Sequence, residues 1–371
     1  MKYNKYRIPV SKPNLVNEDF NEIKKAFDSS WISSKSPWVE KFEEIFARKI
    51  SKTKYAASVN SGTSALFLAL KSLGIGEGDE VILPSLTMIA TINAVTLTGA
   101  KSVLVDCKSF EDFNWDIEEV SKKITKKTKV LMPVHLYGYS SDMEKLLKLA
   151  KEKKIYVVED AAESMGATYK RKALGSFGDI SCYSLYSNKI ITTANGGMVA
   201  TNNKKLYELV KKISFFDFNE DSHFTHSIIG YNMVLSGLQA SLGLSQTKRF
   251  EKMLARRREI FNEYKKYLKN QDKYFIPEPI KHQNPNYWFP AIIFKSSKVK
   301  ENVRLHLLRK GIETRVFFRP LHTQPVYRKL FMGEKYEKSE YFYEHGLLLP
   351  SFYELKNSQI KEISKLINSV I

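Results

Sequence analysis

The chain has 371 residues, of which 43% are hydrophobic and 12% aromatic, and its formal net charge at pH 7 is +19. This composition is ordinary for a folded globular protein with a large core. No apolar stretch approaches the roughly 18 residues that span a bilayer, and MKYNKYRIPV lacks the apolar segment of a signal peptide. Cys107 and Cys182 form neither a disulfide framework nor a metal spacing, so we expect a cytoplasmic protein.

The positive charge does not indicate a nucleic-acid-binding protein. The 59 basic residues are interleaved with 40 acidic ones, and only ARRREIF and residues 122–129 are densely basic. We therefore expect no nucleic-acid partner, and attraction of an anionic, phosphorylated substrate explains the charge better. His223 and His226 have no nearby residues that would complete a ligand set, so we expect no metal site.

The first 50 residues predict an arm followed by amphipathic helices. In NEDFNEIKKAFDSS, Asn17 is the expected N-cap, and Phe20, Ile23 and Phe27 recur at helical spacing. The loop WISSKSPW follows, with a tryptophan at each end. Packing of the arm against the main body is the simplest interpretation of this region.

Strands and helices alternate over the next part of the chain. The apolar segments EVILP, SVLVD and KVLMPVHLYG predict strands, and DMEKLLKLAKEKK predicts a helix capped by Asp142. Alternation of this kind predicts an α/β fold with a mostly parallel sheet and helices on both faces.

The C-terminal third predicts a separate, smaller unit. SQTKRFEKMLARRREIFNEYKKYL predicts one long helix that leads into it. The unit contains predicted strands in YWFPAIIF and IETRVF, and predicted helices in KVKENVRLHLLRKG and SQIKEISKLINSV. We expect a large domain over residues 1–245, which includes the arm, and a smaller α+β domain over residues 246–371.

A candidate phosphate site lies in NSGTSALFLALKSLG. Its apolar residues predict a helix, and Ser61, Gly62 and Thr63 stand at the helix start. The free N–H groups and the positive dipole end of a helix bind anions. On spacing alone, however, a plain Ser/Thr helix cap is the favoured interpretation.

The stretch from residue 155 to residue 199 carries the strongest chemical signal. IYVVED predicts a buried strand that ends in Asp160, and GDISCYSLY predicts another strand, followed by a turn with Lys189. Ligands bind at the carboxyl ends of such strands. A lysine amine forms a Schiff base with pyridoxal phosphate (PLP), while an acid keeps the pyridine nitrogen protonated. Either residue alone is weak evidence, because the chain has many lysines and Asp160 also suits a capping or structural role.

Several motifs, in one order along nearly the whole chain, resemble those of a known family. They are NSGTSAL, GDEVILPSLT, PVHLYG, VVEDAAES, GDISCYSLYSNK, GYN and PLHTQPVY. They are similar to motifs of the DegT/DnrJ/EryC1/StrS aminotransferases, the sugar-aminotransferase branch of the fold-type-I PLP-dependent transferases. The flanking segments DSSWISSKSPWVEKFE and GIETRVFF most resemble the GDP-perosamine synthase group of that family.

The resemblance implies a homodimeric PLP-dependent aminotransferase with shared active sites. Glutamate would donate an amino group to a nucleotide-linked keto-deoxysugar for surface polysaccharide biosynthesis, and Lys189 and Asp160 would be catalytic. The residues that would bind the cofactor with these two are Gly62, Thr63, Met88, Glu163, Ser184 and Asn232, and Asn232 would reach the cofactor phosphate of the partner subunit. The residues that would bind the substrate are Ser34, Lys35, Arg315, Arg319 and His322.

Some positions depart from the family pattern. Met88 replaces an aromatic residue that stacks on the pyridine ring, Val234 replaces an arginine, and Asn195 replaces a glutamate. With the additional Arg319, these changes leave open a second acceptor class, a small phosphorylated ketone such as dihydroxyacetone phosphate. Lys189 argues against the related branch of the family that has histidine at this position and catalyses dehydration.

Overall fold

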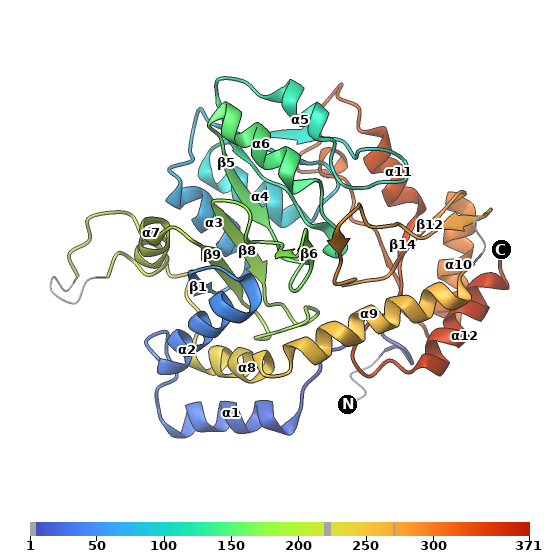
Figure 1. Ribbon diagram of the computed structural model, residues 1–371, viewed down its shortest axis with the longest axis horizontal. Helices are drawn as coiled ribbons and strands as arrows, with labels where there is room; N and C mark the ends of the chain where they lie inside the picture. The colour runs from blue at the N-terminus through green and yellow to red at the C-terminus, as the bar shows by residue number, and fades with distance from the viewer. Residues whose placement is uncertain (1–4, 219–223, 270–271) are drawn as a thin grey trace.

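A seven-stranded sheet organises the N-terminal part of the chain (Figure 1). The computed structural model describes residues 5–218, 224–269 and 272–371. Neighbouring strands of this sheet pair in parallel, except that β9 runs antiparallel to both of its neighbours. The predicted α/β fold with a mostly parallel sheet is therefore confirmed. The spatial order is β1 (Tyr55–Val59), β9 (Gly197–Thr201), β8 (Ile180–Ser184), β5 (Tyr156–Asp160), β4 (Thr128–Leu131), β2 (Glu80–Pro84) and β3 (Lys101–Val105).

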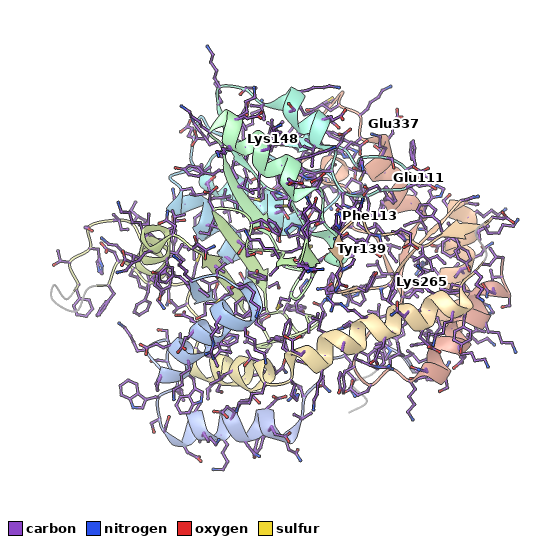
Figure 2. All side chains as sticks on the ribbon, in the orientation of Figure 1. Glu111, Phe113, Tyr139, Lys148, Lys265 and Glu337 are labelled. Atoms are coloured by element: carbon purple, nitrogen blue, oxygen red, sulfur yellow. The ribbon has the colours of Figure 1, made fainter. Side chains whose placement is uncertain are left out.

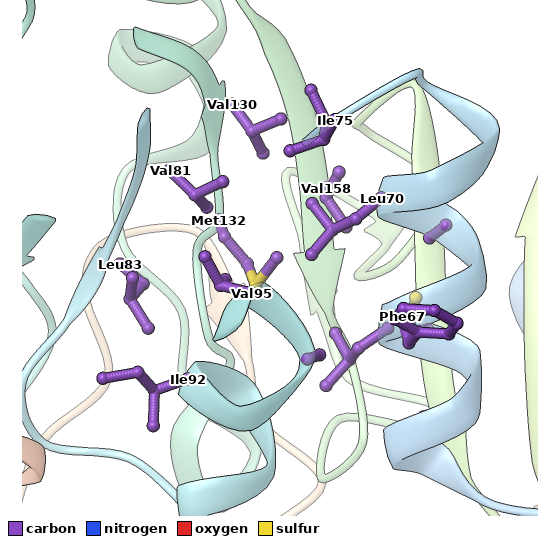
Figure 3. Close-up of a cluster of buried hydrophobic side chains, with 14 of the residues drawn as sticks. Phe67, Leu70, Ile75, Val81, Leu83, Ile92, Val95, Val130, Met132 and Val158 are labelled. Carbon is purple, nitrogen blue, oxygen red and sulfur yellow. The ribbon is translucent and has the colours of Figure 1, made fainter. Parts of the chain in front are cut away.

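Helices cover both faces of this sheet. Successive strand residues point to opposite sides, so each central strand contributes side chains to two cores. Val81 and Val158 lie in the core on one face, together with Phe67 of α3, and Figure 3 shows this cluster. Ile82 and Val157, their neighbours along the strands, lie in the core on the other face. The first face is covered by α3 (Gly62–Ser72), α4 (Ile89–Thr98) and α7 (Lys204–Ser214), and the second by α5 (Ile117–Lys123) and α6 (Met143–Lys153).

A four-stranded antiparallel sheet forms the C-terminal part of the chain. The helices and strands expected there are present, although the strand expected in IETRVF is only two residues long. The strand order is β10 (Tyr274–Phe275), β12 (Ala291–Phe294), β14 (Gly346–Leu348) and β13 (Arg315–Val316), and the helices are α10 (Ser297–Arg309), α11 (Glu337–His345) and α12 (Asn357–Asn368). A small third sheet contains β11 (Gln283–Asn284), β6 (Thr168–Tyr169) and β7 (Lys172–Ala173).

The long helix α9 (Phe250–Tyr267) joins the two parts (Figure 1). Its first turns place Phe250 and Leu254 in a core with residues of the seven-stranded sheet. Its last turns place Phe261 and Tyr264 in the core of the C-terminal part. The division into domains at residue 245 stays a prediction.

The prediction of one long helix in SQTKRFEKMLARRREIFNEYKKYL is wrong. The chain forms α8 (Gly237–Thr247) first and leaves the helix at Lys248 and Arg249 before α9 begins. No glycine or proline marks this break. Instead, the Arg249 guanidinium donates hydrogen bonds of 3.1 and 3.0 Å to the buried carboxylate of Asp19, so a tertiary contact fixes the chain at this point.

The same contact explains the orientation of α1 (Asn17–Asp28). The helix forms where the periodicity predicts it, but Phe20 and Phe27 are 67% and 66% exposed. Asp19 and Ala26 are the residues that face the protein body. The N-cap is Val16 rather than the expected Asn17.

The remaining short elements connect these layers. These elements are α2 (Pro37–Ile45), the π-helix η1 (Phe46–Ser51) and the 3₁₀-helices η2 (Leu136–Gly138) and η3 (Leu321–Thr323).

None of the helices in the described part of the chain is both long and apolar enough to cross a membrane.

Candidate active site

A cavity of about 440 Å³ opens at the carboxyl ends of β5 and β8, beside the start of α3. This volume lies in the range of small-molecule sites, roughly 300 to 1,000 Å³. The strand ends contribute Asp160 and Ser184, and the turn after β8 contributes Lys189. The predicted site residues that line the cavity are Gly62, Thr63, Met88, Asp160, Glu163, Ser184, Lys189 and Arg315.

The Lys189 side chain is buried in the wall of this cavity, with 9% of its surface exposed. A short turn after β8 carries it, and the Lys189 N–H donates to the Tyr186 carbonyl over 2.9 Å. Its Nζ lies 3.6 Å from Oε1 of Glu163. Burial lowers the pKa of the Lys189 amine, although the neighbouring carboxylates oppose this shift. A larger share of this amine is therefore neutral than in a lysine exposed to water.

Asp160 ends β5 with its carboxylate fixed from two sides. Thr91 Oγ1 donates to Oδ2 over 2.9 Å, and the Ala162 N–H donates to Oδ1 over 3.2 Å. Burial raises the pKa of Asp160, while these hydrogen bonds and Lys189 act in the opposite direction. A cation placed against Asp160 would lower this raised pKa, which is the interaction a protonated ring nitrogen supplies.

Glu163 follows three residues later and has fewer donors. Its Oε2 accepts the Tyr137 N–H over 2.8 Å, and its own carbonyl accepts Nδ2 of Asn286 over 2.8 Å. Tyr137 has a left-handed backbone (φ 54°), which is uncommon for a residue other than glycine. Burial raises the pKa of Glu163 to about 7, although Lys189 pulls it in the other direction.

The start of α3 packs against Ser184 in the cavity wall. Ser61 caps the helix by accepting the Ser64 N–H over 3.0 Å, so the interpretation as a helix cap is correct. The first N–H groups of a helix have no acceptor within the helix, which leaves them available to an anion. Close packing requires small residues here, because a Cβ atom added to Gly62 would lie 3.1 Å from Cβ of Ser184 and one added to Gly197 would lie 2.3 Å from the Ser61 carbonyl oxygen.

The other predicted site residues do not line the cavity. Asn232 is exposed, and Arg319 Nε donates to Thr323 Oγ1 over 3.2 Å. His322 is buried, with Nδ1 2.7 Å from Oγ of Ser85 and Nε2 2.9 Å from Oε1 of Glu340. Ser34 and Lys35 lie in the loop between α1 and α2. The roles predicted for these five residues stay predictions.

The structure adds aromatic residues that the motifs did not indicate. Trp288, Phe289 and Phe318 of the C-terminal part line the cavity, with Tyr186 from the turn before Lys189. The run YWFPAIIF predicted only a strand, so the position of Trp288 was missed. The local pattern could not distinguish the two roles, because aromatic residues placed directly before a strand suit a core as well as a binding wall.

These groups fit PLP. A buried amine, a fixed carboxylate and a helix start that can bind phosphate face one cavity. A metal centre has no such support, because the described residues contain no cluster of three or more histidine, cysteine, aspartate or glutamate side chains suited to a metal ion. Of the two histidines considered for a metal, His223 lies outside the described residues.

Comparison with known proteins agrees with this geometry. Residues 13–368 match the DegT/DnrJ/EryC1/StrS aminotransferase family. The chain is 41% identical to GDP-perosamine synthase of Escherichia coli O157:H7, over 99% of this chain and 98% of that protein. It is 31% identical to spore coat polysaccharide biosynthesis protein SpsC of Bacillus subtilis (strain 168), over 98% of this chain and 97% of that protein.

Solved structures show the same fold. Spr1654 from Streptococcus pneumoniae, described as a sugar aminotransferase, superimposes in its PMP form with a TM-score of 0.93 at 27% identity, covering 98% of each chain. Its PLP form gives a TM-score of 0.92 at 26% identity, covering 99% of this chain and 100% of that one.

Proposed function

Because this chain belongs to the DegT/DnrJ/EryC1/StrS aminotransferase family and is a PLP-dependent aminotransferase, we propose an acceptor and a role for each site residue. The acceptor is a nucleotide-linked keto-deoxysugar, glutamate is the donor, and the product serves surface polysaccharide biosynthesis. The relatives support this acceptor, since one is a GDP-perosamine synthase and another a polysaccharide biosynthesis protein. They give no support to a small phosphorylated ketone.

The observation that carries the proposal is that Lys189 shares one cavity with two buried carboxylates, of which Glu163 lies 3.6 Å from its Nζ. PLP supplies an aldehyde that exchanges amino groups and a ring that takes up an electron pair. Lys189 Nζ would hold the cofactor covalently and, when free, would move a proton at the reacting substrate carbon. The lowered pKa of this amine favours its neutral form, which can accept that proton.

The remaining residues of the cavity would hold the cofactor and an anion of the substrate. Asp160 would keep a proton on the ring nitrogen, and Glu163 would lie near the ring hydroxyl. Gly62, Thr63 and Ser184 would bind the phosphate at the start of α3. Arg315 lines the cavity and would pair with a carboxylate or phosphate of the substrate, which an arginine can bind through two hydrogen bonds.

The remaining predicted roles depend on a second subunit and on the loop before α2. In a homodimer with shared active sites, the exposed Asn232 would reach the partner's cofactor phosphate. Ser34, Lys35, Arg319 and His322 would contribute to the substrate side only in that assembly or after loop closure. Analytical ultracentrifugation tests the dimer directly. The cytoplasmic location expected from the cysteines stays a prediction.

Replacement of Lys189 tests the proposal. We expect Lys189→Ala to lose turnover and the yellow absorbance of bound PLP while its circular dichroism spectrum stays native. Lys148→Ala is the matched control, because Lys148 is an exposed lysine on α6 that does not line the cavity (Figure 2). Retention of the yellow colour and turnover by Lys189→Ala would rule out its role.

A panel of acceptors tests the substrate. The aminated cofactor form is mixed in turn with nucleotide-linked keto-deoxysugars and with dihydroxyacetone phosphate, and its absorbance is followed. We expect only the nucleotide-linked ketones to return it to the aldehyde form. Conversion by dihydroxyacetone phosphate alone would overturn the proposed acceptor and leave the aminotransferase activity intact.

A further inference from the structure

Trp288 lies directly against the Lys189 amine. Nζ of Lys189 is 3.6 Å from the centroid of the indole ring. A cation within about 6 Å of an aromatic centroid is attracted by the negative face of the ring, and tryptophan gives the strongest attraction. The other cation–ring contacts among the described residues have centroid distances of 4.6 to 5.9 Å. Among the described residues, Lys189 and Trp288 therefore make the closest cation–ring contact.

The indole ring is fixed in this position by hydrogen bonds. Its Nε1–H donates to the Asn188 carbonyl over 2.8 Å, and Asn188 directly precedes Lys189. The Trp288 N–H donates to Oδ1 of Asn286 over 3.0 Å, and the Trp288 carbonyl accepts Nη1 of Arg257 over 3.1 Å. The ring is 4% exposed. The ring therefore cannot leave Lys189 without breaking its hydrogen bond to the Asn188 carbonyl.

Asn286 also connects Trp288 to the backbone of the segment that carries Glu163. Its Nδ2 donates to the carbonyls of Glu163 and Met165 over 2.8 and 3.0 Å. Gly138 leaves room for this amide, because a Cβ atom there would lie 1.9 Å from Oδ1 of Asn286. One amide thus fixes both the ring and the acidic segment that flank the amine.

We propose that Trp288 is a positioning residue that holds the Lys189 side chain over its ring in the cofactor-free protein, where the ring face attracts the ammonium form of the amine. The inference rests on the proposed function, since it concerns the amine that would hold PLP. Three charged groups also act on Lys189: Glu163 and Asp160 favour the ammonium, and Arg315 opposes it. The ring attraction differs from theirs because it remains when Glu163 takes up a proton.

The test measures the protonation of Lys189 in the cofactor-free full chain. The protein reacts briefly with acetic anhydride across a pH series, and mass spectrometry of the peptide with Lys189 gives the labelling midpoint. Loss of the ring in Trp288→Leu should lower this midpoint. At any one pH below the midpoint, the neutral fraction of Lys189 should then be about 2- to 30-fold larger than in the wild type. A change in access alone would alter the plateau of labelling and leave the midpoint in place.

Three further proteins separate the ring from other effects. Trp288→Phe keeps an aromatic face and loses the hydrogen bond to Asn188, so its midpoint should stay closer to wild type than that of the Leu variant. Tyr287→Leu removes the adjacent aromatic residue, which stacks on Phe261 at 3.6 Å and lies outside the cavity, and should leave the midpoint unchanged. Fluorinated tryptophan weakens the negative face with little change in shape, so it should lower the midpoint even if Trp288→Leu fails to fold.

An unchanged midpoint in both the Leu variant and the fluorinated protein would overturn the inference. So would a Phe variant whose midpoint falls as far as that of the Leu variant, because the hydrogen bond would then be responsible. These midpoints are measured without PLP. A wild-type protein that binds no PLP at Lys189 would instead defeat the proposed function, so the two failures are distinguishable.

Discussion

Two buried glutamates on one segment have opposite surroundings, although they are only four positions apart. Glu159 is fully buried and accepts Nε2 of His135 over 2.8 Å. It also accepts three backbone N–H groups from the turn at residues 175–178, over 2.6 to 2.7 Å. Glu163 accepts a single N–H, from Tyr137, and has the Lys189 amine 3.6 Å away.

The number of donors decides which of these carboxylates keeps its charge. Burial alone would raise the pKa of Glu159, but His135 and the backbone donors lower it below its usual value. With fewer donors, burial raises the pKa of Glu163 to about 7. Glu159, within β5, is therefore a fixed structural anion. Glu163, which follows β5 and lines the cavity, is a carboxyl group that can change its charge near neutral pH.

The largest expected effect comes from removing the fixed anion. Glu159→Ala leaves several buried donors without an acceptor, so we expect a loss of about 3 to 5 kcal/mol in the free energy of unfolding. Urea unfolding followed by circular dichroism measures it. Glu152→Ala, an exposed residue of α6, is the control and should change stability by less than about 0.5 kcal/mol. Equal values for the two variants would contradict the assignment of Glu159.

Glu163→Gln should remove a pH dependence instead. The folded pKa of Glu163, about 7, lies above its ordinary value of 4.5, so between these pH values the folded protein binds more protons than the unfolded chain. The stability that this group contributes is full below the ordinary pKa and declines as the pH rises through the folded one. Glutamine does not titrate, so the variant should lack this decline, which amounts to about 1 to 3 kcal/mol.

Urea unfolding of the cofactor-free protein at pH 5 and pH 7 measures this difference. The wild type should lose stability between the two pH values relative to Glu163→Gln. Parallel changes in both proteins would show that Glu163 does not titrate in this interval, and the contrast with Glu159 would then disappear.

The smallest expected effect concerns two helix caps, one at the cavity and one away from it. Ser61 and Ser296 cap α3 and α10 by accepting N–H groups over 3.0 and 3.4 Å. Replacement of either serine by alanine should cost about 1 kcal/mol of unfolding free energy. Only Ser61→Ala should also weaken PLP binding, measured by titration of the cofactor-free protein, because Ser61 lines the cavity and Ser296 does not. Equal PLP affinity in both variants would argue against a phosphate site at the start of α3.

The sequence was sufficient for the fold class, the family and the cofactor because their signals are local. Buried strands gave apolar runs, and the motifs around Asp160, Ser184 and Lys189 are contiguous segments that end at one edge of the sheet. The structure brings these residues to one cavity, and the role of each stays a prediction.

The features that were missed depend on contacts between distant segments. Trp288 reaches Lys189 from 99 positions away, and no local pattern shows this approach. The break before α9 follows from the pairing of Arg249 with Asp19, which lies 230 positions earlier. The same pairing buries a charged side of α1 and turns Phe20 outward, against the periodicity of its sequence. Periodicity identifies a helix but does not show which of its sides meets the protein.

The position of α9 has a consequence for how the enzyme loses its site. The Trp288 and Arg315 walls of the cavity come from the C-terminal sheet region, whereas Lys189 and Asp160 come from the larger sheet. The helix α9 packs into both hydrophobic interiors, and Tyr137 and Trp288 meet in a further core that the two parts share. Partial loss of these contacts would separate the aromatic wall from the amine while either sheet remained intact, so catalysis should fail at a lower temperature than secondary structure.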